Sequence, residues 1–256
     1  MSVLTALTAA LSSGSIEVVD LTSPLSHETP ILELPPEFGQ TQRFTLEEIS
    51  RYDDRGPAWY WNNFRTGEHT GTHFDAPNHW VSGKDLADID SVPVSALVAP
   101  AVVLDVTDEV ASNADFLIEV EHLEAFQAEH GAFPAGGWLL CRTGWSARTT
   151  QQEMINNTET GPTSPGMSAE CARWVAEESP LQGIGVETVG TDAGAAHSFD
   201  PAFPCHAFLL GNGKYGLAQL QNLDRLPVTG AVVVASPLRI VGGSGSPARV
   251  LALVER

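Results

Sequence analysis

Four side chains capable of metal or acid–base chemistry lie within eleven residues of this chain, in the stretch HTGTHFDAPNHW at positions 69–80. They are His69, His73, Asp75 and His79, in a chain with only 8 histidines among 256 residues. Two imidazoles and a carboxylate form a ligand set for Zn²⁺, Mn²⁺ or Fe²⁺ that leaves positions open for water and substrate. A metal held in this way lowers the pKa of its water and polarises a carbonyl, which are the two requirements of hydrolysis. The stretch therefore predicts a hydrolytic metal site.

The spacing within the stretch separates its residues into two groups. Counted from His69, the offsets of the other three are 4, 6 and 10, and even offsets share one face of an extended chain. A helix would also align His69 with His73, but Pro77 would break it. We expect His69, His73 and Asp75 to converge from an extended segment. His79, beyond Pro77, could approach the same point as an acid–base group. The alternative, a polar loop with chance histidines, is disfavoured by this same-face spacing.

The elements that must position these residues are mainly short strands. Six β-branched apolar runs predict buried strands at 16–21, 101–106, 138–143, 183–188, 231–236 and 248–254. Two helices are expected: one over 119–131, with Leu123 and Phe126 inward and Gly131 at its end, and one over 168–179, opened by Ser168. Strands outnumber helices and do not alternate strictly with them. This pattern favours a mixed α/β or α+β domain over a doubly wound fold.

Residues 22–64, just before the histidine stretch, are rich in proline and aromatic residues. Such long irregular segments are usually functional or cover another surface, and an arm that packs on a neighbouring subunit is the alternative. Trp59, Trp61, Phe64 and Trp80 flank the expected ligands. These aromatics are candidates for a substrate-binding wall, and ordinary core packing is the competing interpretation.

Composition restricts the possible partners and location. The formal net charge is −19, from 32 acidic and 13 basic residues, which disfavours nucleic acid and an anionic membrane surface as partners. The 3 cysteines are widely spaced and are expected to be reduced. The N-terminus lacks the basic region of a signal peptide, and no apolar run approaches the roughly 18 residues of a membrane span. We expect a soluble, cytoplasmic protein.

The stretch 69–80 resembles the HxGTHxDxPxH signature of the cyclase-like metal-dependent hydrolase superfamily, whose branches include kynurenine formamidases and isatin hydrolases. Further segments resemble other motifs of this family, in the same order along the chain: Asp20–Ser26, Arg142–Trp145, Gly185–Thr188 with Asp192, Cys205–Leu210 and Asn222–Asp224. One of them departs from the usual pattern, since Glu187 stands where the family usually has Asp. The resemblance covers most of the chain.

The resemblance implies a role for each site residue. His69, His73 and Asp75 would be metal ligands, His79 the acid–base group, and His206 a second catalytic or ligand histidine. Formamidases of this family carry a Glu that helps bind a second metal where this chain has Ala218 and Gln219. A neutral amide is a poorer partner for a second divalent cation than a carboxylate is. We therefore expect one divalent metal, Mn²⁺ or Zn²⁺, with Gln219 as a further ligand or orienting group.

The same resemblance implies the fold and activity. We expect one domain over 1–256 with an arm at about 22–64, built on a mixed, partly barrel-like sheet flanked by helices, the cyclase-like swivelling β/β/α fold. The expected reaction is hydrolysis of a C–N bond in a small aromatic cyclic amide or an N-formyl aryl amine, with the isatin-hydrolase-like branch favoured. A lactone or enol-lactone hydrolase and a non-catalytic small-molecule-binding protein are the alternatives. Members of the family commonly form dimers or tetramers, so a homodimer or homotetramer is expected.

Overall fold

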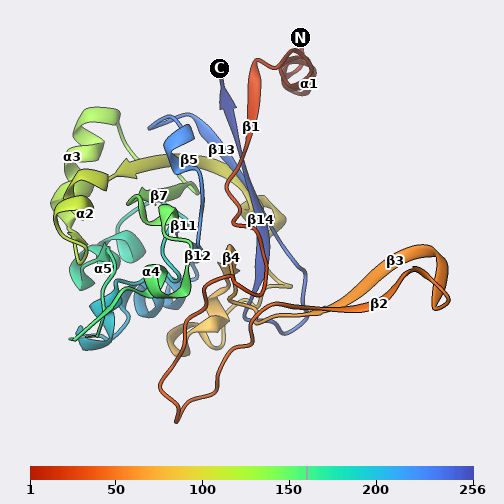
Figure 1. The fold of residues 1–256 in the computed structure, drawn as a ribbon. Helices are drawn as coiled ribbons and strands as arrows, with labels where there is room; N and C mark the ends of the chain where they lie inside the picture. The colour runs from red at the N-terminus through yellow and green to blue at the C-terminus, as the bar shows by residue number, and fades with distance from the viewer. Residues whose placement is uncertain (160) are drawn as a thin grey trace.

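The computed structural model describes residues 1–159 and 161–256 and is built around a closed barrel of mixed strands (Figure 1). Each strand pairs with the next around the barrel, in the order β14 (Gly245–Glu255), β13 (Ala231–Pro237), β5 (Val98–Asp105), β7 (Trp138–Arg142), β11 (Gly183–Val186), β12 (Tyr215–Ala218) and β4 (His73–Asp75). Strand β4 then pairs with β14 and closes the ring. The pairs among β5, β7, β11 and β12 are parallel and the others antiparallel. The predicted mixed, partly barrel-like sheet is confirmed.

Strand β14 makes closure possible because it is long enough to serve two partners on one edge. Its first residues pair with β4, and its last residues pair with β1 (Ile16–Asp20), which lies outside the ring. All six predicted strands are present, as β1, β5, β7, β11, β13 and β14. The short strand β12 was not predicted, since its four residues include Gly216 and are too few for a pattern.

The strands of the barrel bury apolar side chains on both faces. Inside the barrel, the Phe74 ring packs against Trp138 and Tyr215, with ring centroids 5.9 and 5.3 Å apart. On the outer face of β5, β7 and β11, residues such as Leu139 and Ile184 form a second core with the helices. Burying one such side chain stabilises the fold by about 1.5–3 kcal/mol, so both layers hold β4 and its neighbours in register.

Helices cover one side of this sheet (Figure 1). The two predicted helices are present as α3 (Val120–His130) and α5 (Ala169–Glu177), together with the shorter α2 (Thr107–Ser112) and α4 (Gln151–Ile155). Ser168 caps α5 as expected, since its side chain accepts a hydrogen bond from the backbone N–H of Cys171. Leu123 and Phe126 are buried, and α3 ends at Gly131, in agreement with the predicted stripe and stop.

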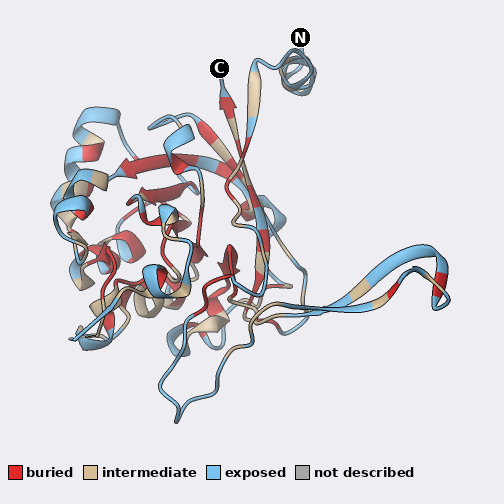
Figure 2. Ribbon diagram, in the orientation of Figure 1, coloured by how far each residue is buried: buried red, intermediate tan, exposed pale blue. Residues whose placement is uncertain are grey.

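Two segments stand away from the barrel, as the burial colouring of Figure 2 shows. Helix α1 (Val3–Ser13) has no buried residue along its fully described length. Strands β2 (Thr45–Asp53) and β3 (Gly56–Arg65) form a long hairpin that projects from the body. The expectation of an irregular segment over 22–64 is therefore wrong for its second half. Both faces of the hairpin are largely exposed, so its strands lack the alternation that marks a half-buried strand.

The remaining strands are two-residue pieces in the connections. Strand β6 (Leu117–Ile118) pairs with β10 (Gly166–Met167), and β8 (Asn157–Thr158) pairs with β9 (Gly161–Pro162). Among the described residues, no helix is long and apolar enough to cross a membrane. The three cysteines Cys141, Cys171 and Cys205 are buried and unpaired, as the sequence predicted.

Candidate active site

The carboxylate of Asp75 is the centre of the site, on β4 between β12 and β14. Asp75 is 1% exposed, and its register partners are Gly216 on one side and Gly245 on the other. A Cβ at Gly216 would lie 2.7 Å from Oδ2 of Asp75, and one at Gly245 would lie 2.5 Å from Cε1 of His69. Glycine on both neighbouring strands therefore leaves the space that the carboxylate and the imidazole occupy.

Two of the predicted ligands approach the same carboxylate oxygen. Nδ1 of His69 lies 2.7 Å from Oδ1 of Asp75, and Nε2 of His73 lies 3.3 Å from it. The other nitrogen of His73, Nδ1, lies 2.7 Å from the carbonyl oxygen of Gly71. The predicted extended conformation holds only for 73–75. Gly71 has a φ of 65°, which turns the chain so that His69 reaches Asp75 from a loop and not along a strand.

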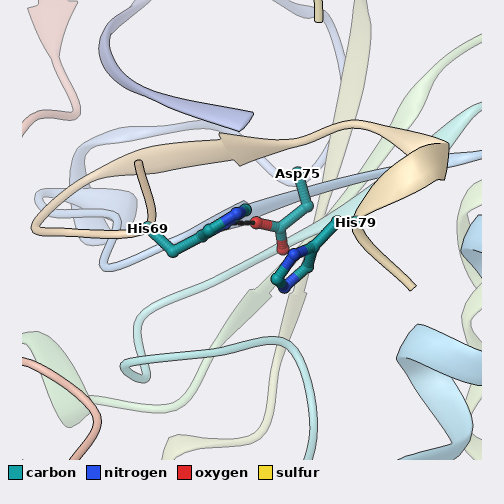
Figure 3. A group of neighbouring side chains, drawn as sticks. All are labelled: His69, Asp75 and His79. Carbon is teal, nitrogen blue, oxygen red and sulfur yellow. Dashed lines mark hydrogen bonds and ion pairs between the residues drawn. The ribbon is translucent and has the colours of Figure 1, made fainter. Parts of the chain in front are cut away.

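His79 lies closer to the centre than the sequence suggested. It ends a short turn that begins at Pro77, and its ring stacks on His69 with centroids 3.7 Å apart. Candidate ligand atoms of His69, Asp75 and His79 all lie within 4.8 Å of one another. Figure 3 shows the oxygens of the Asp75 carboxylate directed toward the two imidazole rings. Proximity thus makes His79 a candidate ligand as well as a candidate acid–base group.

The buried setting controls the charges of these groups. Burial alone would raise the pKa of Asp75, but His73 and His69 outweigh it and hold that pKa well below its usual value. Burial lowers the pKa of His79 to about 3, against the opposing effect of the Asp75 charge and with help from the neighbouring histidines. An ionised carboxylate surrounded by imidazole nitrogens is the donor set that Zn²⁺ and Mn²⁺ take in proteins. The residues present therefore fit a divalent metal ion.

His206 lies on a π-helical turn, Cys205–Leu210. Its Nδ1 lies 2.5 Å from Oδ2 of Asp192, and its ring centroid is 5.4 Å from that of His79. Burial opposes the charged form of His206, but the hydrogen bond to Asp192 and the charges of Asp192 and Asp75 prevail, so its pKa is raised. The structure thus brings His206 to the predicted cluster, with a carboxylate partner.

The predicted aromatic wall is divided by the fold. Trp80 lies beside His206, with ring centroids 4.8 Å apart. Trp59, Trp61 and Phe64 lie on β3, where they are 49%, 54% and 57% exposed. The hairpin of β2 and β3 projects from the barrel (Figure 1). Of the four predicted aromatics, Trp80 is the one whose ring contacts the site histidines His79 and His206.

Gln219 is almost completely buried and adopts a left-handed backbone conformation with a φ of 50°. Its Nε2 donates a hydrogen bond to the carbonyl oxygen of Pro30, 2.9 Å away, and its backbone carbonyl oxygen accepts one from the hydroxyl of Thr72. These contacts attach the proline-rich segment to the barrel next to β4. The role of Gln219 as a ligand stays a prediction.

Two residues at the site were not found from the sequence. Oγ of Ser244 lies 2.9 Å from Nε2 of His69 and donates a hydrogen bond to Oε2 of Glu68, 2.6 Å away. Glu68 directly precedes His69, and Ser244 belongs to the glycine-rich segment 242–247. Neither position in the sequence indicates that Glu68 and Ser244, which are 176 residues apart, form a hydrogen bond.

This chain belongs to the cyclase family, because the family model described as "Putative cyclase" matches residues 19–193. Isatin hydrolase of Roseibium aggregatum is 44% identical over 259 residues, which cover 100% of this chain and 98% of that protein. A solved isatin hydrolase bound to the product analogue thioisatinate is 43% identical, superposes with a TM-score of 0.96 and covers 100% of both chains. The predicted family, fold and hydrolase class are confirmed.

Other members of the family are less similar. Kynurenine formamidase of Salinibacter ruber is 30% identical over 195 residues, which cover 74% of this chain and 77% of that protein. A solved protein described as a potential metal-dependent hydrolase with cyclase activity is 24% identical with a TM-score of 0.68, over 94% of this chain and 98% of that one, and shows the fold alone. The higher identity to isatin hydrolase agrees with the branch that the sequence favoured.

Proposed function

We propose that this chain hydrolyses the C–N bond of a small aromatic cyclic amide, with isatin as the reference substrate, by means of one divalent metal ion. The observation that carries the proposal is the buried carboxylate of Asp75, with imidazole nitrogens of His69 and His73 within 2.7 and 3.3 Å of one of its oxygens. The full-length similarity to isatin hydrolases supports the choice of bond and substrate class.

His69, His73 and Asp75 are the proposed metal ligands, with His79 as the competing ligand that proximity suggests. A divalent ion held there would lower the pKa of a water molecule and polarise the amide carbonyl. We propose a single ion, Mn²⁺ or Zn²⁺. The neutral amide of Gln219 supports a single ion, since its nitrogen is already hydrogen-bonded to Pro30 and it offers no carboxylate for a second cation.

The two remaining histidines divide the proton transfers between them. His79, whose burial favours the neutral form, accepts the proton that water loses as it adds to the carbonyl. His206, whose protonated form Asp192 favours, delivers a proton to the departing nitrogen. Groups whose environments move their pKa values apart suit the roles of base and acid.

The substrate wall is proposed to combine Trp80 with aromatics from a second copy of the chain. Trp59, Trp61 and Phe64 are exposed on the projecting hairpin, where a neighbouring subunit could receive them. A homodimer or homotetramer would then complete each site, and light scattering of the purified protein checks this. A cytoplasmic location is part of the proposal, supported by three unpaired cysteines.

A substrate panel on metal-reconstituted protein tests the function. Isatin, an N-formyl aryl amine and an enol-lactone are compared, and the expected result is turnover of isatin with the highest kcat/KM. If the N-formyl aryl amine or the enol-lactone is hydrolysed with a higher kcat/KM, that compound represents the substrate class in place of isatin. Tight binding without turnover of any of the three would indicate a non-catalytic protein.

Metal analysis of variants tests the ligand set. Wild type should hold about one ion per chain, as expected for a single site that leaves positions open for water and substrate. His73→Ala should lose the ion, His79→Ala should retain it but lose turnover, and His130→Ala on α3 should behave as wild type. If His79→Ala loses the ion and His73→Ala retains it, His79 is the metal ligand and His73 is not.

A further inference from the structure

We propose that Glu68 and Ser244 are positioning residues that lock His69 in the tautomer protonated on Nε2, so that His69 presents Nδ1 to the metal. This inference rests on the metal site of the proposed function. It concerns the orientation and protonation of one ligand, which neither the sequence motifs nor the ligand assignment determines.

The direction of the hydrogen bonds carries the argument. The hydroxyl of Ser244 donates to Oε2 of Glu68 at 2.6 Å, since a carboxylate oxygen can only accept. A serine hydroxyl has one hydrogen, so Oγ can only accept from its other neighbour, Nε2 of His69, at 2.9 Å. Nε2 of His69 therefore carries a proton.

The remaining nitrogen of His69 then becomes the one available for a cation. Nδ1 faces Oδ1 of Asp75 at 2.7 Å, and a bare lone pair that close to a carboxylate oxygen would be repelled. Either a proton or a metal ion must be shared between them. His73 has the opposite arrangement, because its Nδ1 contacts the carbonyl oxygen of Gly71 and its Nε2 faces Asp75. The two histidines thus present different nitrogens to one carboxylate.

The hydrogen-bonded chain Glu68–Ser244–His69, called the relay below, is also held by backbone hydrogen bonds that do not need the Ser244 hydroxyl. The carbonyl oxygen of Ser244 accepts a hydrogen bond from the N–H of Ala76, the residue after Asp75. The next residue back, Gly243, accepts from the N–H of Ile89, and a Cβ there would lie 2.9 Å from Oε1 of Glu68. Removal of the Ser244 hydroxyl should therefore leave the segment in position.

Zn²⁺ binding, measured by competition with a chromogenic chelator, tests the relay without reference to turnover. Ser244→Ala is expected to bind Zn²⁺ about 10–100-fold more weakly, as is typical for loss of a hydrogen-bond partner of a metal ligand. Glu68→Gln preserves the shape of the side chain but should weaken Zn²⁺ binding similarly. Its amide N–H can donate to Oγ of Ser244, which lets the Ser244 hydroxyl turn and donate to Nε2 of His69. Asp88→Asn is the matched control, since Asp88 accepts from the N–H of Gly242 in the same segment but does not contact the relay.

Long-range ¹H–¹⁵N NMR of the Zn²⁺-loaded protein reads the tautomer directly. Wild-type His69 should show its proton on Nε2, and a proton on Nδ1 overturns the proposal. Unchanged Zn²⁺ affinity in both Ser244→Ala and Glu68→Gln also overturns it, as does an equal loss in Asp88→Asn. Failure of wild type to bind Zn²⁺ or Mn²⁺ at all would instead contradict the proposed function, so the two failures are distinguishable.

Discussion

Oδ2 of Asp192 lies 2.5 Å from Nδ1 of His206, and the same carboxylate accepts the backbone N–H groups of both Cys205 and His206. One side chain therefore both caps the start of the π-helical turn and orients the imidazole that the turn carries. Because Nδ1 is engaged by Asp192, Nε2 is the nitrogen of His206 left for chemistry. A carboxylate placed in this way also favours the protonated ring.

The first prediction concerns Asp192→Asn. Loss of the negative charge should lower the pKa of His206, whose elevation depends on Asp192. His206 acts as an acid in the proposed mechanism, so activity falls as pH rises through its pKa. The alkaline limb of kcat should move to lower pH, with kcat reduced about 10²-fold or more, as for loss of a general acid. The pH–rate profile checks this, with exposed Asp108→Asn as control, and an unmoved alkaline limb would contradict it.

The barrel strands could be predicted because most of them are buried on both faces. Residues of β5 and β7 alternate between the barrel interior and the layer under the helices, so these strands read as continuous apolar runs. Hydrophobic patterning also predicted α3 and α5, the two longer helices on the sheet. Each buries one stripe of apolar side chains, which therefore recur with the period of a helix. The hairpin β2–β3 has no such buried face within this chain.

The candidate site could be predicted only in part, because its members meet through long-range contacts. The histidine stretch revealed the cluster, but Gly71 redirects His69 in a way that the even spacing could not show. The partners Ser244 and Gly245 arrive from β14 and the segment before it, about 170 residues further along the chain, and only closure of the barrel brings them to Asp75 and His69. Local sequence patterns do not predict that β14 pairs with β4.

The second prediction uses the two glycines beside Asp75. Gly216→Ala should impair metal binding and turnover, because the added Cβ would lie 2.7 Å from Oδ2 of Asp75 and 2.9 Å from Cγ2 of Thr191. Metal content and kcat are the measurements, and both should fall together. Gly39→Ala is the control, since its Cβ would meet nothing within 4 Å. Wild-type metal content in Gly216→Ala would show that the carboxylate can shift freely.

The third prediction concerns stability and the metal. An ion that binds only the folded state should stabilise it by about 2.7 kcal/mol at a concentration 100 times its Kd, and thus raise the Tm. Zn²⁺ or Mn²⁺ should therefore raise the Tm of metal-free protein, and a chelator should reverse the change. Asp75→Asn should remove this shift, since the site loses its anionic ligand. An equal metal-dependent shift in Asp75→Asn would place the binding elsewhere.

The last prediction concerns Glu187, the residue that directly follows β11. Its buried carboxylate accepts the backbone N–H of Thr143 at 2.6 Å, the hydroxyl of Thr143 at 3.0 Å and that of Ser146 at 2.6 Å. Glu187→Ala leaves these donors unpaired, and each unsatisfied buried group costs about 1–3 kcal/mol.

Urea unfolding should show that Glu187→Ala lowers the free energy of unfolding by about 3 kcal/mol, with a smaller loss for Glu187→Gln, which keeps one acceptor oxygen. Glu177→Ala, at an exposed position on α5, should change it little. Equal losses in the Ala and Gln variants would mean that charge, and not the number of acceptors, holds the turn at Thr143. No loss in either would mean that the turn is stabilised by the packing of Trp145, which is 1% exposed, without help from the carboxylate.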